Sequence, residues 1–444
     1  ISSKDNVSAS FRLNGFFNGM NGDIKNTISV LDSSISYINS TNSITGGLSY
    51  DANADYKHKF KKEDQEFTLS AQYTNNNRDV DYTSDFDPTI IAIGFDSILS
   101  EKSQNNSVNK EATYQADYTH PFTKKTSLEA GAKTILREVV SEYDYQKYDA
   151  MQGIYVEDTS RNNDFDYLQN IYAGYLQVAT GYKRWGFKLG GRYEKTDIEG
   201  KFQKGIPGFT SDYDNLIPYT TLSYSNLGKY SFKLSYTQRI QRPSMTYLNP
   251  YVNNSDPTNI SYGNPDLEPE TSNSFELGCN LFKSFGSINT SIYHRFTNNA
   301  IESYRFINDK EQYVTTYGNI GKNYSTGGSA SLQVMWKMKV MGGANFNIYY
   351  YKVINDSLGK SNDGVNYNIS LFFSYKFNDK WGVQTFGMFN GPKYSIQGKS
   401  TSFYFYNLSA RRSFAKDKGG LSFGVDRKST RLNSSHVSES RMPS

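Results

Sequence analysis

The side chains that could do chemistry in this 444-residue chain are few and scattered. The three histidines before the C-terminal tail are His58, His120 and His294, and none has a second ligand at the spacing of a zinc site. No serine is marked as their partner in a hydrolase triad. The acidic run at residues 79–87 lacks the glycine and the closing glutamate of a calcium loop. We therefore predict no enzyme activity, no metal site and no cofactor.

The composition indicates a hydrophilic protein that is rich in aromatic residues. The chain has 37 Tyr and 28 Phe but only 3 Trp, and its mean hydropathy is −0.67. Tyrosine has an apolar ring and a polar tip, which suits a membrane interface. No run of residues approaches the ~18 apolar residues that a spanning helix needs. The formal charge is only +4, which gives no support for a nucleic-acid partner.

The elements that must position these side chains follow a rhythm of short turns and long polar stretches. The long stretches are residues 75–109, 141–166, 195–214 and 239–270, and the acidic run falls in the first of them. Compact turns are predicted at residues 61–65, 121–126, 183–186, 225–229, 283–287, 336–341, 376–381 and 415–420. Short turns at one end and long loops at the other are typical of an outer-membrane β-barrel.

Segments beside these turns alternate between apolar and polar residues. Residues 66–73 place Phe67, Leu69 and Tyr73 on one face, and residues 230–239 and 368–377 repeat the pattern. This period predicts strands that are wet on one side, with the apolar face toward lipid and the polar face toward the lumen. An ordinary sheet with one packed face gives the same alternation, but the turn rhythm and the composition disfavour it. Cys279, the single cysteine, falls on an apolar face, so we expect a lipid-facing thiol.

The predicted fold class is all-β, a transmembrane antiparallel β-barrel. The eight turns and a hairpin expected around residues 14–23 give roughly 18 strands. A bilayer does not tolerate open sheet edges, so we expect a complete barrel of about 22 strands, of which this chain is a fragment.

We expect residues 1–426 to be the barrel domain, cut at both ends and without a plug domain. Residues 427–444 have no alternation, no Tyr and no Phe. They resemble a translated sequencing adapter, so we expect a non-native tail. A native, disordered basic tail is the alternative.

One proline-rich segment, from residue 238 to residue 278, has a distinctive pattern. Each proline holds the residue before it in an extended conformation. Gly263 permits a tight bend before Asn264, and Glu276 alternates with apolar neighbours, so it should face the lumen. The pattern predicts a strand that leaves the membrane, a stiffened loop and a strand that re-enters.

This pattern resembles the C-terminal barrel of TonB-dependent outer-membrane receptors, especially the outer membrane protein beta-barrel family that is abundant in Bacteroidetes. The matching residues are Arg242, Pro243, Leu248, Asn249, Pro250, Gly263, Asn264, Pro265, Leu267, Pro269, Glu270, Glu276 and Gly278. Asn319 and Gly321 resemble a later Asn-x-Gly element of the family.

The resemblance implies an integral protein of a Gram-negative outer membrane. Its implied partners are outer-membrane lipid, an N-terminal plug domain of the same protein, the TonB complex and an unknown small solute. The implied function is active uptake of that solute, which could be a siderophore, cobalamin, an oligosaccharide or a peptide.

Two other functions remain open, a plugless porin or protein-export channel and a surface adhesin or scaffold. Charged side chains expected in the lumen would contact a plug in a receptor and would set ion selectivity in a pore. They are Lys133, Lys233, Arg239, Glu276 and Lys376. Long loops are the expected contact surface in every case.

Overall fold

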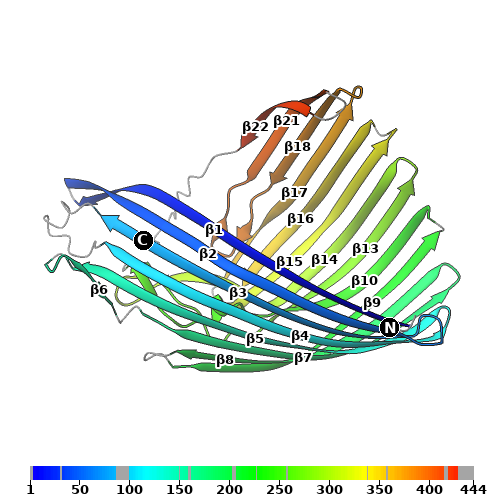
Figure 1. Cartoon of the computed structure of the whole chain (residues 1–444), viewed down its shortest axis with the longest axis horizontal. Coiled ribbons are helices and arrows are strands. Elements are labelled where there is room, and N and C mark those ends of the chain that lie inside the picture. Colours follow the sequence, from blue (N-terminus) through cyan, green and yellow to red (C-terminus); the bar gives the residue numbers. More distant parts are fainter. Residues whose placement is uncertain are drawn as a thin grey trace.

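The computed structural model describes residues 4–30, 33–86, 100–149, 151–158, 162–202, 207–226, 228–256, 259–337, 339–356, 359–414 and 419–428. Seventeen strands follow one another in a single antiparallel meander that curves into an open trough (Figure 1). They are β1 (Asp5–Val30), β2 (Ser33–Lys59), β3 (Glu66–Phe86), β4 (Glu101–Thr123), β5 (Thr126–Asp149), β7 (Phe165–Tyr182), β8 (Trp185–Phe202), β9 (Phe209–Asn226), β10 (Tyr230–Gln241), β13 (Glu270–Lys283), β14 (Gly286–Ile307), β15 (Tyr313–Trp336), β16 (Val340–Asn355), β17 (Lys360–Lys376), β18 (Trp381–Asn390), β21 (Phe403–Phe414) and β22 (Gly419–Lys428). Among the described residues no pairing joins β1 to β22, so these two strands are the edges of the sheet.

Short elements complete the structure. Strands β6 (Ile154–Glu157), β11 (Asn253–Asp256) and β12 (Asn259–Ser261) bring the sheet to 20 strands. Strands β19 (Tyr394–Ser395) and β20 (Gly398–Lys399) form a separate hairpin, and α1 (Met245–Leu248) is a helix of 4 residues. In these ranges no helix has the length and apolarity needed to cross a bilayer.

The predicted short turns lie between consecutive strands. Tyr182 and Trp185, for example, pair across a turn of two residues. Lys183 in that turn has a φ of 55° and Lys337 has a φ of 49°, so both occupy the left-handed region that tight hairpins require. The connection between β21 and β22, residues 415–418, lies outside the described residues.

The hairpin predicted around residues 14–23 is wrong. Strand β1 runs through this region without a break, and it pairs with β2 from Asp5↔His58 to Val30↔Ser33. The glycines that resemble a turn stand in the strand instead, because the pairing with β2 continues through them: Gly15, Gly19 and Gly22 stand opposite Leu48, Ile44 and Thr41. The described meander therefore has 17 strands, one fewer than predicted.

Three of the four long polar stretches are mostly strand rather than loop. Strand β3 continues to Phe86, so the described part of the acidic run, residues 79–86, lies on a wall strand. Only ~9–11 residues of each strand cross the bilayer. Beyond it both faces of a strand are wet, so the apolar alternation that marks a strand is lost. Only the stretch 239–270 leaves the wall for most of its length.

Strand β22 ends at Lys428, two residues beyond the predicted boundary of the barrel. Arg427 pairs with Tyr406 of β21. The rest of the expected tail, residues 429–444, lies outside the described residues.

The two faces of the wall differ as the alternation predicts. On β7, Leu168 and Leu176 of the outer face are 37% and 54% exposed, whereas Tyr167 and Gln169 of the inner face are 2% and 4% exposed. Cys279 shares its face with the exposed Leu277, which confirms that the thiol points outward. The outer face is the lipid-facing surface of a barrel.

Aromatic residues gather at the short-turn end. All three tryptophans, Trp185, Trp336 and Trp381, lie there and are about half exposed, at 46–55%. Such a girdle is typical of the level where lipid headgroups meet water.

Candidate functional site on the inner wall

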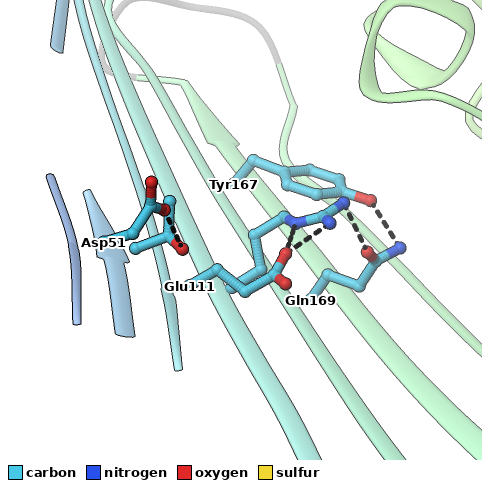
Figure 2. Close-up of polar contacts among 6 residues, drawn as sticks. Asp51, Glu111, Tyr167 and Gln169 are labelled. Carbon is cyan, nitrogen blue, oxygen red and sulfur yellow. Dashed lines mark hydrogen bonds and ion pairs between the residues drawn. The ribbon is translucent and has the colours of Figure 1, made fainter. Parts of the chain in front are cut away.

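Polar side chains form a row across the inner face of the wall (Figure 2). Asp51, Thr74, Glu111, Arg137 and Gln169 stand opposite one another on β2, β3, β4, β5 and β7. The Thr74 hydroxyl donates to Asp51 at 2.8 Å. The Arg137 guanidinium donates to Glu111 at 2.9 Å and to the Gln169 carbonyl at 3.3 Å. Charge-assisted bonds of this kind fix the orientation of the inner surface.

Tyr167 lies at the end of this row and is labelled in Figure 2. The Gln169 amide donates to its hydroxyl at 3.1 Å. Tyr167 is near the end of β7 that is far from the short turn, beyond the ~9–11 residues of the strand that cross the bilayer. Burial raises the pKa of Tyr167 to about 12, against the opposing influence of Arg137 and Arg242. The phenol is therefore neutral at physiological pH.

Arg242, the first residue of the family motif, is held by strand β8. Its guanidinium forms an ion pair with Glu194 and donates to the Thr196 hydroxyl at 3.1 Å. Arg192 approaches the other oxygen of the Glu194 carboxylate at 2.5 Å. The Glu194 side chain is only 5% exposed, so this carboxylate depends on both guanidinium groups.

From Arg242 the chain turns into the trough, and residues 242–269 are here called the inward segment. The Ser244 side chain caps α1 by accepting from the backbone N–H of Tyr247 at 3.3 Å. Leu248 and Leu267 are 0% and 2% exposed, and both pack into one apolar cluster. The other buried members of that cluster come from β5, β7 and β8 and are Val139, Phe165, Tyr167 and Ile198. Full burial of a leucine contributes about 1.5–3 kcal/mol, so this cluster fastens the segment to one wall.

The other side of the inward segment contacts β14 and β15. The Asn264 side chain donates to the backbone carbonyl of Tyr317 at 3.1 Å. The ring of Tyr247 stacks on the ring of Tyr317 with 4.3 Å between centroids. Strand β12 pairs in parallel with the start of β15. The segment thus bridges two walls that are far apart in the strand order.

Asn319, which the sequence marked as part of a weaker family element, is a main contact of this bridge. Its side-chain oxygen accepts from the Glu268 N–H at 2.8 Å. Its amide donates to the carbonyls of Glu268 and Asn299 at 2.8 and 2.9 Å. The adjacent Gly321 has no room for a side chain, because a Cβ there would lie 2.9 Å from Glu302.

Gly263 has a different role from the bend that we predicted. It is not among the glycines with positive φ. Instead, a Cβ on Gly263 would lie 2.5 Å from the carbonyl oxygens of Asn249 and Tyr247. Its N–H donates to the Asn249 carbonyl at 2.7 Å, so two stretches of backbone meet here at a distance that only glycine allows.

The motif therefore divides into two groups. The structure gathers the residues from Arg242 to Pro269 in the inward segment, and Glu270 follows at the first position of β13. Glu276 and Gly278 lie further along β13, on the wall. Glu276 faces the inner cavity described below, which confirms its predicted direction.

Two carboxyl groups lie beside the re-entry point, beyond the bilayer-crossing part of their strands. Glu270 accepts from the Ile301 N–H at 2.8 Å. Burial raises the pKa of Glu270 and also the pKa of Glu302. The negative charge of Glu270 raises the pKa of Glu302 further. A carboxylate pair held this way is easier to protonate than an exposed one.

A second inward element, the β19–β20 hairpin, was not predicted. Gln397 exchanges two 3.2 Å hydrogen bonds with the backbone of Arg305 on β14, and Ile396 is 5% exposed. The Tyr394 ring occupies the space beside Gly364. The only sequence signal was the break in alternation after β18.

The inner face of β13 to β18 carries a row of small uncharged residues. Small polar residues stand in one row on six successive strands. They are Gly278, Ser291, Ser329, Asn347, Asn368 and Asn390. They line a cavity of about 660 Å³, with Lys233 and Glu276 among its other lining residues. The signal in the sequence is serine and asparagine at alternate positions of these strands.

Glycines on the inner face lie under aromatic rings of the next strand. Gly190 stands opposite Tyr219, and a Cβ on Gly190 would lie 2.5 Å from that ring. The Tyr219 hydroxyl donates to Gln177 at 2.8 Å. Gly131 under Tyr175 and Gly200 under Phe209 repeat the arrangement. Such pairs supply the packing that glycine alone lacks in a sheet.

We expect Gly190→Ala to lower stability by about 1–3 kcal/mol, because the new methyl group displaces Tyr219 from Gln177. Gly191→Ala is the matched control, since nothing lies within 4 Å of its Cβ position. The measurement is the temperature at which each variant loses its folded migration on a detergent gel. Equal loss in both variants would contradict the packing role of the pair.

Among the described residues no group of three or more His, Cys, Asp or Glu side chains is placed to hold a metal ion. What the inner wall offers is a large polar surface with two inward elements. This arrangement can bind and orient a solute or a protein domain.

Comparisons with known proteins agree on a family and a fold. The family model described as "Outer membrane protein beta-barrel family" matches residues 58–427. No curated protein sequence matches the chain.

Several solved structures share the fold over nearly the whole chain. The siderophore receptor PiuA from Acinetobacter baumannii has 14% identity and a TM-score of 0.60, with 94% of this chain and 70% of that chain covered. The ferric-catecholate import receptor Fiu from K12 E. coli has 10% identity and a TM-score of 0.59, with 93% and 72% covered. The unliganded ferric citrate transporter FecA has 12% identity and a TM-score of 0.62, with 94% and 65% covered.

These neighbours are transporters and receptors rather than enzymes, and each is longer than this chain. The family match and the lipid-facing outer surface lead to one conclusion. The chain belongs to the outer membrane protein beta-barrel family and is an integral protein of the outer membrane.

Proposed function

We propose that this protein is the barrel part of a TonB-dependent receptor that takes up a scarce solute by active transport. The solute would be a siderophore, cobalamin, an oligosaccharide or a peptide. The proposed partners are a plug domain of the same protein and the TonB complex.

The observation that carries the proposal is the inward segment. It crosses from the wall of β5, β7 and β8 to the wall of β14 and β15, so it occupies lumen that a diffusion pore would leave open. A polar inner wall with a partly occupied lumen suits a receptor that binds its solute before moving it. The similarity to a siderophore receptor (PiuA), a ferric-catecholate import receptor (Fiu) and a ferric citrate transporter (FecA) supports the same function.

The test is uptake of labelled solutes by cells that express the complete receptor gene, with and without a functional TonB protein. The panel contains a ferric siderophore, cobalamin, an oligosaccharide and a peptide. We expect one class to accumulate above its external concentration, and only in cells with TonB.

Two outcomes would contradict this proposal. Uptake that merely equilibrates and ignores TonB would indicate a porin or an export channel. Binding of a partner to the loops without uptake of any solute would indicate an adhesin or a scaffold.

A further inference from the structure

Positive charge is concentrated at the short-turn end of the wall. The chain as a whole has a formal charge of only +4. Exposed lysine and arginine residues nevertheless lie in or beside almost every described short turn, and we call them the basic ring. Its members are Lys61, Lys62, Lys124, Lys125, Lys183, Arg184, Lys229, Lys283, Lys337, Lys339, Lys380 and Arg412.

The same turns contain few acidic residues. By the same measure, only Glu63, Asp64, Glu66 and Asp379 accompany the twelve cations in the described residues. Within the described ranges no member of the basic ring lies within 4.0 Å of a carboxylate, although nearby Lys57 does pair with Glu66. The turn edge of the sheet, at the right and top of Figure 1, is thus a band of uncompensated positive charge.

The opposite end of the wall carries charge of both signs, although its connection after β18 holds Lys393 and Lys399 without an acidic residue. The connection after β14 holds Asp309, Lys310 and Glu311, and the described part of the connection after β16 begins with Asp356. Positive charge is therefore denser and less compensated by carboxylates at the short-turn end than at the opposite end.

Several members of the basic ring lie directly on the aromatic girdle. The Lys337 amine lies 5.0 Å from the Trp336 ring, and the Arg412 guanidinium lies 5.3 Å from the Trp381 ring. Lys183 lies 5.4 Å from the Tyr182 ring. Because the girdle marks the level of the lipid headgroups, these cations are at the membrane surface and not deep in the periplasm.

Short turns face the periplasm in outer-membrane barrels, so the leaflet beside the basic ring is the periplasmic one. Basic residues at a membrane surface attract anionic headgroups at short range, and arginine and lysine both bind phosphate. We propose that the basic ring is a binding surface for anionic phospholipid headgroups of the periplasmic leaflet, and that it selects these lipids over zwitterionic ones.

The tryptophans allow a direct test. All three lie at the short-turn end, so quenching of their fluorescence by brominated lipids reports the lipids beside the basic ring. The complete receptor, with any tryptophan outside this chain replaced by phenylalanine, would be folded into vesicles that mix phosphatidylglycerol and phosphatidylcholine, with bromine on one lipid and then on the other. We expect phosphatidylglycerol to be preferred roughly fivefold or more.

Two variants with four lysines replaced by glutamine form a matched pair. The ring variant carries Lys124→Gln, Lys125→Gln, Lys183→Gln and Lys339→Gln. The control carries Lys310→Gln, Lys360→Gln, Lys393→Gln and Lys399→Gln, all exposed residues of the opposite end. We expect the preference to fall toward one in the ring variant and to persist in the control.

A salt titration of the unmodified chain needs no variant. In about 1 M salt the Debye length is roughly 3 Å, so the preference should largely disappear. Equal quenching by the two lipids at low salt would overturn the proposal and would indicate that the ring faces water or an acidic protein. An unchanged preference in the folded ring variant would overturn it as well.

Discussion

Replacing Gly263 by alanine is expected to dislodge the inward segment from the wall. The added Cβ would lie 2.5 Å from two backbone carbonyl oxygens, those of Asn249 and Tyr247, and 2.7 Å from the Asn249 nitrogen. No side-chain rotation can relieve a clash with backbone. When the backbone moves to relieve the clash, two hydrogen bonds would be lost: the Gly263 N–H donates to the Asn249 carbonyl at 2.7 Å, and the Asn264 N–H donates to the Tyr247 carbonyl at 2.6 Å.

The expected cost is about 3 kcal/mol or more, above the usual range for overpacking, because backbone must move. The measurement is limited proteolysis of the folded protein from the loop side, followed by N-terminal sequencing of the fragments. We expect new cleavage within residues 242–269 while the wall strands stay intact. Gly174→Ala is the control, since nothing lies within 4 Å of its Cβ position. An uncleaved Gly263→Ala protein would contradict the role of close packing here.

Arg242→Ala is expected to have an effect of similar size through charge. It leaves the 5% exposed Glu194 side chain with Arg192 as its only ion-pair partner among the described residues. Removing one partner of a buried ion pair costs about 3–5 kcal/mol, and the remaining guanidinium should reduce this to about 2–3 kcal/mol. The readout is the midpoint of urea unfolding in detergent micelles.

Lys195→Ala, next to Glu194 on strand β8, is the control for Arg242→Ala. Lys195 and Asp197 form an exposed pair at 3.8 Å, so we expect a change below about 0.5 kcal/mol. Adding Glu194→Gln to Arg242→Ala should recover part of the loss, because it removes the uncompensated charge. If the double variant is less stable than Arg242→Ala alone, the electrostatic explanation fails.

The alternation of apolar and polar residues predicted the strands of the wall well. Alternation on residues 230–239 placed Leu234 outside and Lys233 inside, and the structure has Leu234 51% exposed and Lys233 on the inner cavity. This worked because each bilayer-crossing strand faces lipid on one side and water on the other, so the pattern is local. It failed beyond the bilayer, where residues 75–86 are strand although both faces are wet.

The site could not be predicted in the same way, because its contacts join distant residues. Arg242 pairs with a residue 48 positions earlier, and Asn319 binds Glu268 across 51 positions. The motif marked both Arg242 and Asn319 as residues of interest. Nothing in their local sequence indicates that Arg242 binds Glu194 of β8, or that Asn319 binds the other side of the inward segment.

The bridge across the lumen can be tested most directly by cross-linking. In a Cys279→Ser background, Tyr247→Cys and Tyr317→Cys place two thiols where the rings now stack at 4.3 Å. We expect a short bifunctional thiol reagent to join them in intact membranes. A pair of Tyr247→Cys with Lys337→Cys, at the short-turn end, should stay unjoined. Failure of the first pair to cross-link, with both thiols freely labelled from the loop side, would show that the segment projects into the medium and would contradict a bridged lumen.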